Sequence, residues 1–152
     1  MAERSELRHI AHRGNLRGPI PSRENRQDYI DQALERGFEA EVDVWAINEN
    51  LWLGHDSPQY ETNLNWLEER SSHLWVHCKN LGAVDYLAST ELNWFFHNQD
   101  DLTITNKGFL WCFPGMTLLS TEFVMLSFGH EKPPIPSNAI GICSDYPASW
   151  ID

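Results

Sequence analysis

Two acidic residues one position apart form the part of the chain whose chemistry is easiest to interpret. Apolar and polar residues alternate from Phe38 to Trp45, which is typical of a β-strand with one buried face. Glu41 and Asp43 then share one face with Glu39, opposite a face that is wholly apolar. If that face points into the fold, the adjacent carboxylates need a cation, and oxygen ligands of this kind suit Mg²⁺ or Ca²⁺. The alternative is an acidic edge strand that faces solvent.

Other ionisable residues stand where extended segments end. They are His12 and Arg13 after residues 7–11, His55 and Asp56 after residues 51–53, and Lys79 at the end of residues 74–79. In parallel α/β folds, functional sites form at the carboxyl ends of the strands. A single histidine is more often a surface residue or a satisfied core residue. Several such groups at successive strand ends together indicate a site.

The elements that must position these residues alternate between strands and helices in the first part of the chain. A helix is predicted from Asn25, which can cap it, to Gly37 at its C-terminal end, because the apolar residues between them fall on one face. Helical stretches are also expected around residues 64–67 and at 82–88, and further strands at 94–97, 109–113, 123–126 and 139–143. This order favours a parallel sheet with right-handed crossovers, and the many short strands suggest a barrel.

The length of the chain limits how large such a barrel can be. A complete (β/α)₈ barrel takes ~250 residues, whereas this chain has 152. The expected fold is therefore α/β, a compressed TIM-like (β/α) barrel with several helices shortened or replaced by loops. We expect a single domain over residues 1–152.

Composition excludes some partners and suggests a compartment. The net charge is −11 with only 11 basic residues in no evident cluster, which argues against nucleic acid and anionic membranes as partners but leaves a small anionic substrate open. Three widely spaced cysteines, Cys78, Cys112 and Cys143, predict buried thiols in a reducing compartment. The charged start of the chain, Met1 to Arg8, and the absence of an apolar run of ~20 residues predict a cytoplasmic protein without a transmembrane segment.

Several blocks of the sequence resemble the signature of the glycerophosphodiester phosphodiesterases, in that family's order and approximate spacing. They are His12-Arg13-Gly14, Glu24-Asn25, Glu41-x-Asp43 and His55-Asp56 after a Leu-Gly step, with a final strand block at Ile142 to Pro147. The segment from Gly82 to Asn138 shows little similarity to the family.

The resemblance implies a TIM-barrel fold and a role for each matching residue. His12 and His55 would be the general acid/base pair, Glu41 and Asp43 metal ligands, Arg13 and Lys79 phosphate contacts, and Glu24 a member of the metal-site surroundings. It also implies attack by the substrate's own hydroxyl through a cyclic phosphate, a route favoured by the high effective molarity of an internal nucleophile.

The sequence departs from the family pattern at one strand and in its size. His77-Cys78-Lys79 stands where the family usually has Glu-x-Lys, so His77 is a candidate metal ligand that favours Mn²⁺ or Zn²⁺ over Mg²⁺. His77 could instead hydrogen-bond to substrate or pack in the core. A short chain also leaves little room for substrate-binding insertions, and the polar run from His97 to Asp101 could shape the alcohol pocket or be a hydrated loop. Trp45 and Trp75 could line that pocket, although core packing is more common.

The resulting hypothesis is a hydrolase of lipid metabolism, a metal-dependent phosphodiesterase that acts on small glycerophosphodiester-type substrates with one bound divalent ion, Mg²⁺, Ca²⁺ or Mn²⁺. One alternative is a lyase that releases the cyclic phosphate, as spider-venom phospholipases of the D type and bacterial phosphoinositide phospholipases do. The other is a phosphate-binding module that has lost catalysis, against which the two histidines argue. The oligomeric state does not follow from the sequence.

Overall fold

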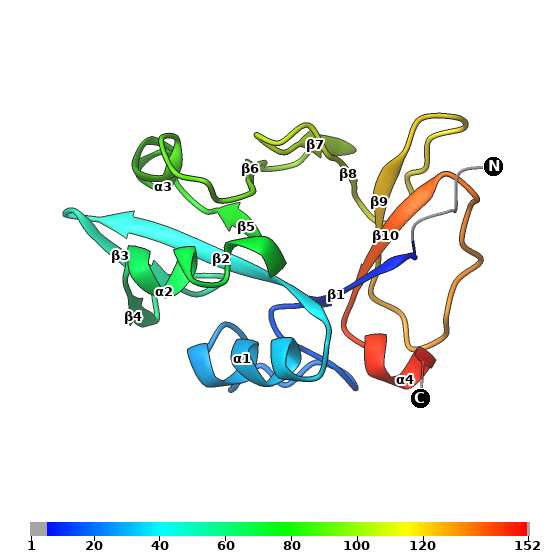
Figure 1. The fold of residues 1–152 in the computed structure, drawn as a ribbon, viewed down its shortest axis with the longest axis horizontal. Helices are drawn as coiled ribbons and strands as arrows, with labels where there is room; N and C mark the ends of the chain where they lie inside the picture. Colours follow the sequence, from blue (N-terminus) through cyan, green and yellow to red (C-terminus); the bar gives the residue numbers. More distant parts are fainter. Residues whose placement is uncertain (1–5, 152) are drawn as a thin grey trace.

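A computed structural model of the chain describes residues 6–151, so the first five residues and Asp152 lie outside the described part. Strands dominate the described part and helices are few and short (Figure 1). The strands are β1 (Arg8–His12), β2 (Glu39–Ile47), β3 (Asn50–Leu53), β4 (Tyr60–Thr62), β5 (Leu74–Cys78), β6 (Trp94–Phe96), β7 (Leu102–Ile104), β8 (Leu110–Cys112), β9 (Phe123–Ser127) and β10 (Ala139–Ser144). The helices are α1 (Gln27–Glu35), α2 (Leu64–Glu68), the short 3₁₀ helix η1 (Ser71–His73), α3 (Leu81–Leu87) and α4 (Pro147–Ile151).

All of these strands belong to one mixed sheet that curls into a half-barrel (Figure 1). Its order is β4-β3-β2-β1-β10-β9-β8-β7, with β5 paired to β2 and β6 paired to β5. The neighbours β6, β5, β2, β1, β10, β9 and β8 run parallel, whereas β3, β4 and β7 pair antiparallel. The parallel strands bring their carboxyl ends to one edge of the sheet.

The expected TIM-like barrel is wrong, because strands and helices do not alternate around the sheet. A helix of two turns or so joins parallel neighbours only at β1-α1-β2 and β5-α3-β6 within the described residues. The chain passes from β2 to β5 through an antiparallel extension and α2, and it reaches β9 and β10 through loops 113–122 and 128–138. Those loops contain prolines and glycines and no helical period, so the sheet lacks the outer ring of helices that covers a (β/α)₈ barrel.

The first helix forms largely as its pattern predicts. α1 buries Tyr29, Ile30 and Ala33 against the sheet. It ends in a Schellman motif, in which Gly37 at φ +90° donates its N–H to the Leu34 carbonyl and the next N–H reaches Ala33. Its start differs from expectation, because Arg26 occupies the N-cap position and no side chain caps the helix. Asn25 instead forms hydrogen bonds with Asp43 of β2.

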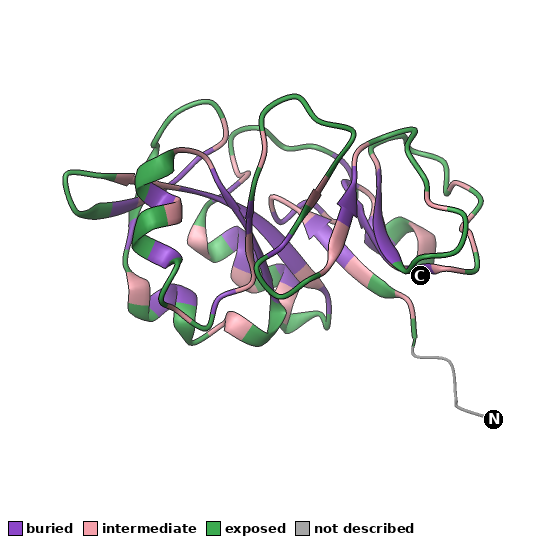
Figure 2. Cartoon of the chain, turned by 90° about the horizontal axis from the view of Figure 1, so that it is seen from above, coloured by how far each residue is buried: buried purple, intermediate pink, exposed green. Residues whose placement is uncertain are grey.

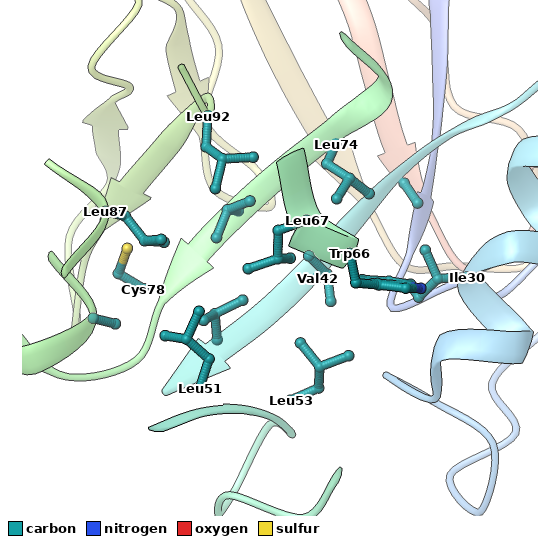
Figure 3. Close-up of a cluster of buried hydrophobic side chains, with 14 residues drawn as sticks. Ile30, Val42, Leu51, Leu53, Trp66, Leu67, Leu74, Cys78, Leu87 and Leu92 are labelled. Carbon is teal, nitrogen blue, oxygen red and sulfur yellow. The ribbon is translucent and has the colours of Figure 1, made fainter. Parts of the chain in front are cut away.

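Buried residues follow the strands of the curled sheet (Figure 2), and apolar clusters pack on both of its faces. Figure 3 shows the outer cluster, in which Val42 of β2 packs with Ile30 of α1, Leu53 of β3 and Leu67 of α2. A second cluster, with Trp75, Phe95, Trp111 and Leu126 among its members, fills part of the concave face. Strand alternation therefore assigns the even-numbered residues of β2 to the outer core and Glu41 and Asp43 to the concave face.

Two further predictions concern the cysteines and membrane-spanning helices. The three cysteines are free and buried, as predicted. None of the helices in the described range is long and apolar enough to cross a bilayer.

Candidate metal and acid–base site

Two carboxylates and an imidazole meet on the concave face of the sheet. Asp43 of β2 stands in register with His77 of β5, and Glu41 precedes Asp43 by two positions on the same face. Glu41 and Asp43 are 2% and 1% exposed, which rules out the alternative of a solvent-facing acidic strand. One ligand atom from each of the three residues can be chosen so that all lie within 4.8 Å of one another. His77 Nδ1 lies 3.1 Å from Asp43 Oδ1.

The two carboxylates divide their charge unequally. Burial raises the pKa of Glu41 well above its ordinary value, and the adjacent Asp43 raises it further. Burial by itself would raise the pKa of Asp43 too, but a hydrogen bond and charge interaction with His77, helped by Lys79 and Arg13, lower it. Because two neighbouring carboxylates cannot both ionise cheaply, Glu41 holds a proton while Asp43 stays ionised.

The donor set fits a divalent cation. His77 Nε2 is buried without a hydrogen-bond partner, and the only cationic or hydrogen-bonding neighbour described for the buried Asp43 Oδ1 is His77 Nδ1, so both atoms are placed to coordinate an ion. Two carboxylates with one imidazole make a mixed oxygen and nitrogen set, which Mn²⁺ accepts more readily than Mg²⁺ does. These three residues leave further coordination positions for water or substrate.

His12 reaches the same place from the end of β1. Its Nδ1 lies 2.8 Å from Asp145 Oδ1, and its Nε2 lies 3.8 Å from Glu41 Oε2. Asp145 also accepts a hydrogen bond from Asn15 Nδ2 at 2.9 Å, so the carboxylate that orients His12 is itself held in place. Burial opposes ionisation of Asp145, but the hydrogen bonds with His12 and Asn15 and the charges of His12 and Arg13 together outweigh that effect and lower its pKa.

Asp145 is the site residue that sequence reasoning passed over. It lies inside the block that resembles the family's final strand, yet no role was predicted for it. The rule that predicted the others also applies to it, because Asp145 directly follows β10, whose parallel neighbour is β1.

His55, the second member of the predicted acid/base pair with His12, lies in the turn after β3. Its side chain is 39% exposed, and its Nδ1 lies 2.7 Å from Asp56 Oδ1. Burial lowers the pKa of His55, and the charges of Arg13 and Lys79 lower it further against the opposing charge of Asp43. His55 lines the same cavity as His12.

The predicted phosphate contacts are split between two adjoining cavities. Arg13 lines the cavity of the two histidines, where its Nε lies 3.4 Å from Asp43 Oδ2. Its Nη1 donates to Glu24 Oε2 at 3.2 Å, so Glu24 stands one contact away from the candidate ligands and supports Arg13. Lys79 lines the neighbouring cavity, which shares His55 and His77 with the first.

Asn25 positions a carboxylate and does not cap the helix. Its Nδ2 donates to Asp43 Oδ2 at 2.9 Å, and its Oδ1 accepts the Asp43 backbone N–H at 2.9 Å. The residue has φ +66°, a conformation that asparagine tolerates better than most residues. The expectation of an N-cap is therefore wrong, because this conformation turns the amide toward the sheet.

Aromatic and aliphatic side chains form the rest of the cavity, which has a volume of about 200 Å³. Its lining comprises His12, Arg13, Glu41, Asp43, His55, His77, Phe95, His97, Trp111, Phe113, Leu126 and Phe128. His97, the first residue of the expected hydrated loop, belongs to this lining. Trp75 instead packs on Trp111, and Trp45 donates its indole N–H to the Gly54 carbonyl.

Comparison with families of known proteins, with curated proteins and with solved structures found no match. The site therefore has to be interpreted from its own chemistry.

Proposed function

We propose that this chain is a metal-dependent phosphodiesterase, in which Glu41, Asp43 and His77 hold one divalent ion and His12 and His55 transfer protons. The observation that carries the proposal is a single cavity lined by two histidines, an arginine and the candidate metal ligands. The sequence resemblance to the glycerophosphodiester phosphodiesterases supports the same proposal. Their barrel fold is not required, because β1, β2, β5 and the turn after β3 bring these residues together.

Each group has a task that follows from its surroundings. A divalent ion supplies charge neutralisation on the non-bridging phosphate oxygens. Arg13, held by Glu24, adds a second positive charge beside the same position. Asp145 holds Nδ1 of His12, which leaves Nε2 free to exchange a proton inside the cavity.

His55 is suited to the complementary proton transfer. It lines the same cavity as His12 from a separate strand end, and its lowered pKa favours the neutral, proton-accepting form. With one imidazole neutral and the other charged, one can accept the proton of the attacking hydroxyl while the other donates to the leaving alkoxide. An attacking hydroxyl within the substrate fits a cavity of this small size, and we propose a cyclic phosphate on the pathway.

The substrate class and compartment follow as parts of the same proposal. A cavity of about 200 Å³ in a chain of net charge −11 suits a small diester and disfavours nucleic acid. Free cysteines fit the reducing cytoplasm.

The test measures turnover of a glycerophosphodiester with Mg²⁺, Ca²⁺ or Mn²⁺ and with EDTA, with products followed by phosphorus NMR. EDTA should abolish turnover, and His12→Ala or His55→Ala should lower the rate about 10²- to 10⁴-fold. His73→Ala is the matched control, because His73 is exposed in η1 and lies outside the cavity. Equal rates for wild type, His12→Ala and the EDTA-treated protein would eliminate the proposal.

A further inference from the structure

The cavity has two chemically different walls. One carries the acid, imidazole and guanidinium groups of β1, β2 and β5 and of the turn after β3. The other is built by β6, β8, β9 and the residues that follow them: Phe95, Trp111, Phe113, Leu126 and Phe128. Phe95 and Trp111 are each 1% exposed and belong to the second apolar cluster, on the concave face of the sheet. This wall is therefore a continuation of the core.

His97 lies where the two walls meet. Its ring stacks on His77 of the first wall with 4.7 Å between centroids, and Phe113 of the second wall packs on it at 3.8 Å. Beyond His97, the second wall consists of aromatic and aliphatic side chains. A polar alcohol placed along this wall would meet few groups able to bond its hydroxyls.

The ring arrangement also disfavours a cationic headgroup. Phe95 stacks on His77 at 4.9 Å and on Trp111 at 4.8 Å, so the ring faces are covered by one another. With its faces in contact with His77 and Trp111, Phe95 has no free ring face to offer to a ligand. A quaternary ammonium group prefers ring faces.

From these walls we infer that the diester carries a short hydrocarbon substituent, which packs against Phe113, Phe128 and Leu126 while its phosphate meets the opposite wall. The inference rests on the proposed function and names the substrate class for it. A volume of about 200 Å³ corresponds to on the order of six or seven water molecules at ~30 Å³ each. That space suits a phosphate with a short alkyl or aryl group.

The test compares methyl, propyl and hexyl phosphate with choline phosphate as ligands of the Mn²⁺-loaded protein, by titration calorimetry. Affinity should rise about four-fold per added methylene until the cavity is full, with an increasingly negative heat-capacity change. The kcat/KM values of the matching glycerol alkyl diesters should rise in the same order.

Phe113→Ala should flatten the dependence of affinity on chain length, while Tyr86→Ala, on the exposed side of α3, should leave it unchanged. Affinity independent of chain length, tighter binding of choline phosphate than of propyl phosphate, or no binding of any member would overturn the inference. Chain-length-dependent binding without turnover would instead remove the proposed function, so the two failures are distinguishable.

Discussion

Glu41 is the residue at which folding and the proposed chemistry conflict most directly. It is buried beside Asp43 and 3.8 Å from His12, where an ionised carboxylate is costly in the absence of a cation. The raised pKa of Glu41 is the consequence, because the folded protein keeps a proton there that the unfolded chain releases. A divalent ion would replace that proton and remove the conflict.

This predicts that the metal-free protein loses stability as pH rises above about 4.5, the ordinary value for this glutamate. Below that pH, Glu41 is protonated in both states; above it, only the folded state keeps the proton, so unfolding becomes more favourable with rising pH. Urea denaturation in EDTA from pH 5 to 8 should show a smaller decline for Glu41→Gln than for wild type. All other titratable groups are the same in both proteins, so the difference reports on Glu41.

Added Mn²⁺ should stabilise the wild type increasingly as pH rises and should have little effect on Glu41→Gln. Asp43 and Asp145 do not contribute to the change in stability between pH 5 and 8. Their lowered pKa values make them lose their stabilising contribution only below about pH 3.8, outside the range measured. Identical pH profiles for the two proteins would show that Glu41 is not protonated in the folded state.

At the scale of elements, the turn that follows β3 determines where His55 lies. Gly54 has φ +152° and donates its N–H to the Asp43 carbonyl, which ties the turn to β2. A β-carbon at this position would lie 2.1 Å from the Ser57 carbonyl oxygen, so a larger residue must displace the backbone that carries His55.

Gly54→Ala should therefore cost about 1–3 kcal/mol of stability and lower kcat about 10²-fold by misplacing the imidazole. The measurements are urea denaturation and turnover under conditions in which the variant is fully folded. Gly129→Ala is the control, because nothing lies within 4 Å of an added β-carbon there. Wild-type kcat in a folded Gly54→Ala protein would mean that His55 is not positioned by this turn.

At the scale of the whole molecule, the curl of the sheet brings its polar and apolar walls face to face. The edge at β6 meets the β7–β8 hairpin at Asn106, in the turn between β7 and β8. Its Oδ1 accepts the Trp94 N–H at 2.7 Å, its Nδ2 donates to the Leu92 carbonyl at 2.9 Å, and its backbone N–H bonds to the Trp94 carbonyl. Asn106 thus fastens the β7–β8 hairpin to the start of β6.

Asn106→Ala removes the two side-chain bonds and should lower the free energy of unfolding by roughly 1–3 kcal/mol. The Trp94 amide should also exchange its hydrogen faster, because the β7–β8 hairpin then separates more easily from the start of β6. Gln99→Ala, an exposed position in the loop between β6 and β7, is the control and should change neither quantity. Unchanged exchange at Trp94 in Asn106→Ala would show that the curl does not depend on this contact.

Local sequence pattern is enough to predict most of the strands and many of the residues that line the candidate site. The period of two in β2 places Glu41 and Asp43 on one face, and the ends of β1, β3 and β5 point to His12, His55 and Lys79, whereas His77 is found by its departure from the family pattern. Strand alternation and strand ends can be predicted because they depend on neighbouring residues. The predicted roles of these residues stay proposals.

Residue pairing across the fold, in contrast, was decided only by tertiary structure. Asp145 meets His12 across 133 positions, and Asn25 bonds to Asp43 and not to its own helix, because the parallel pairing of β1 with β10 and β2 makes those carboxylates the nearest partners. The sequence by itself determined which side chains share a face. The curl of a sheet with few covering helices, which no local period encodes, decided that this face encloses an aromatic cavity and not the core of a TIM barrel.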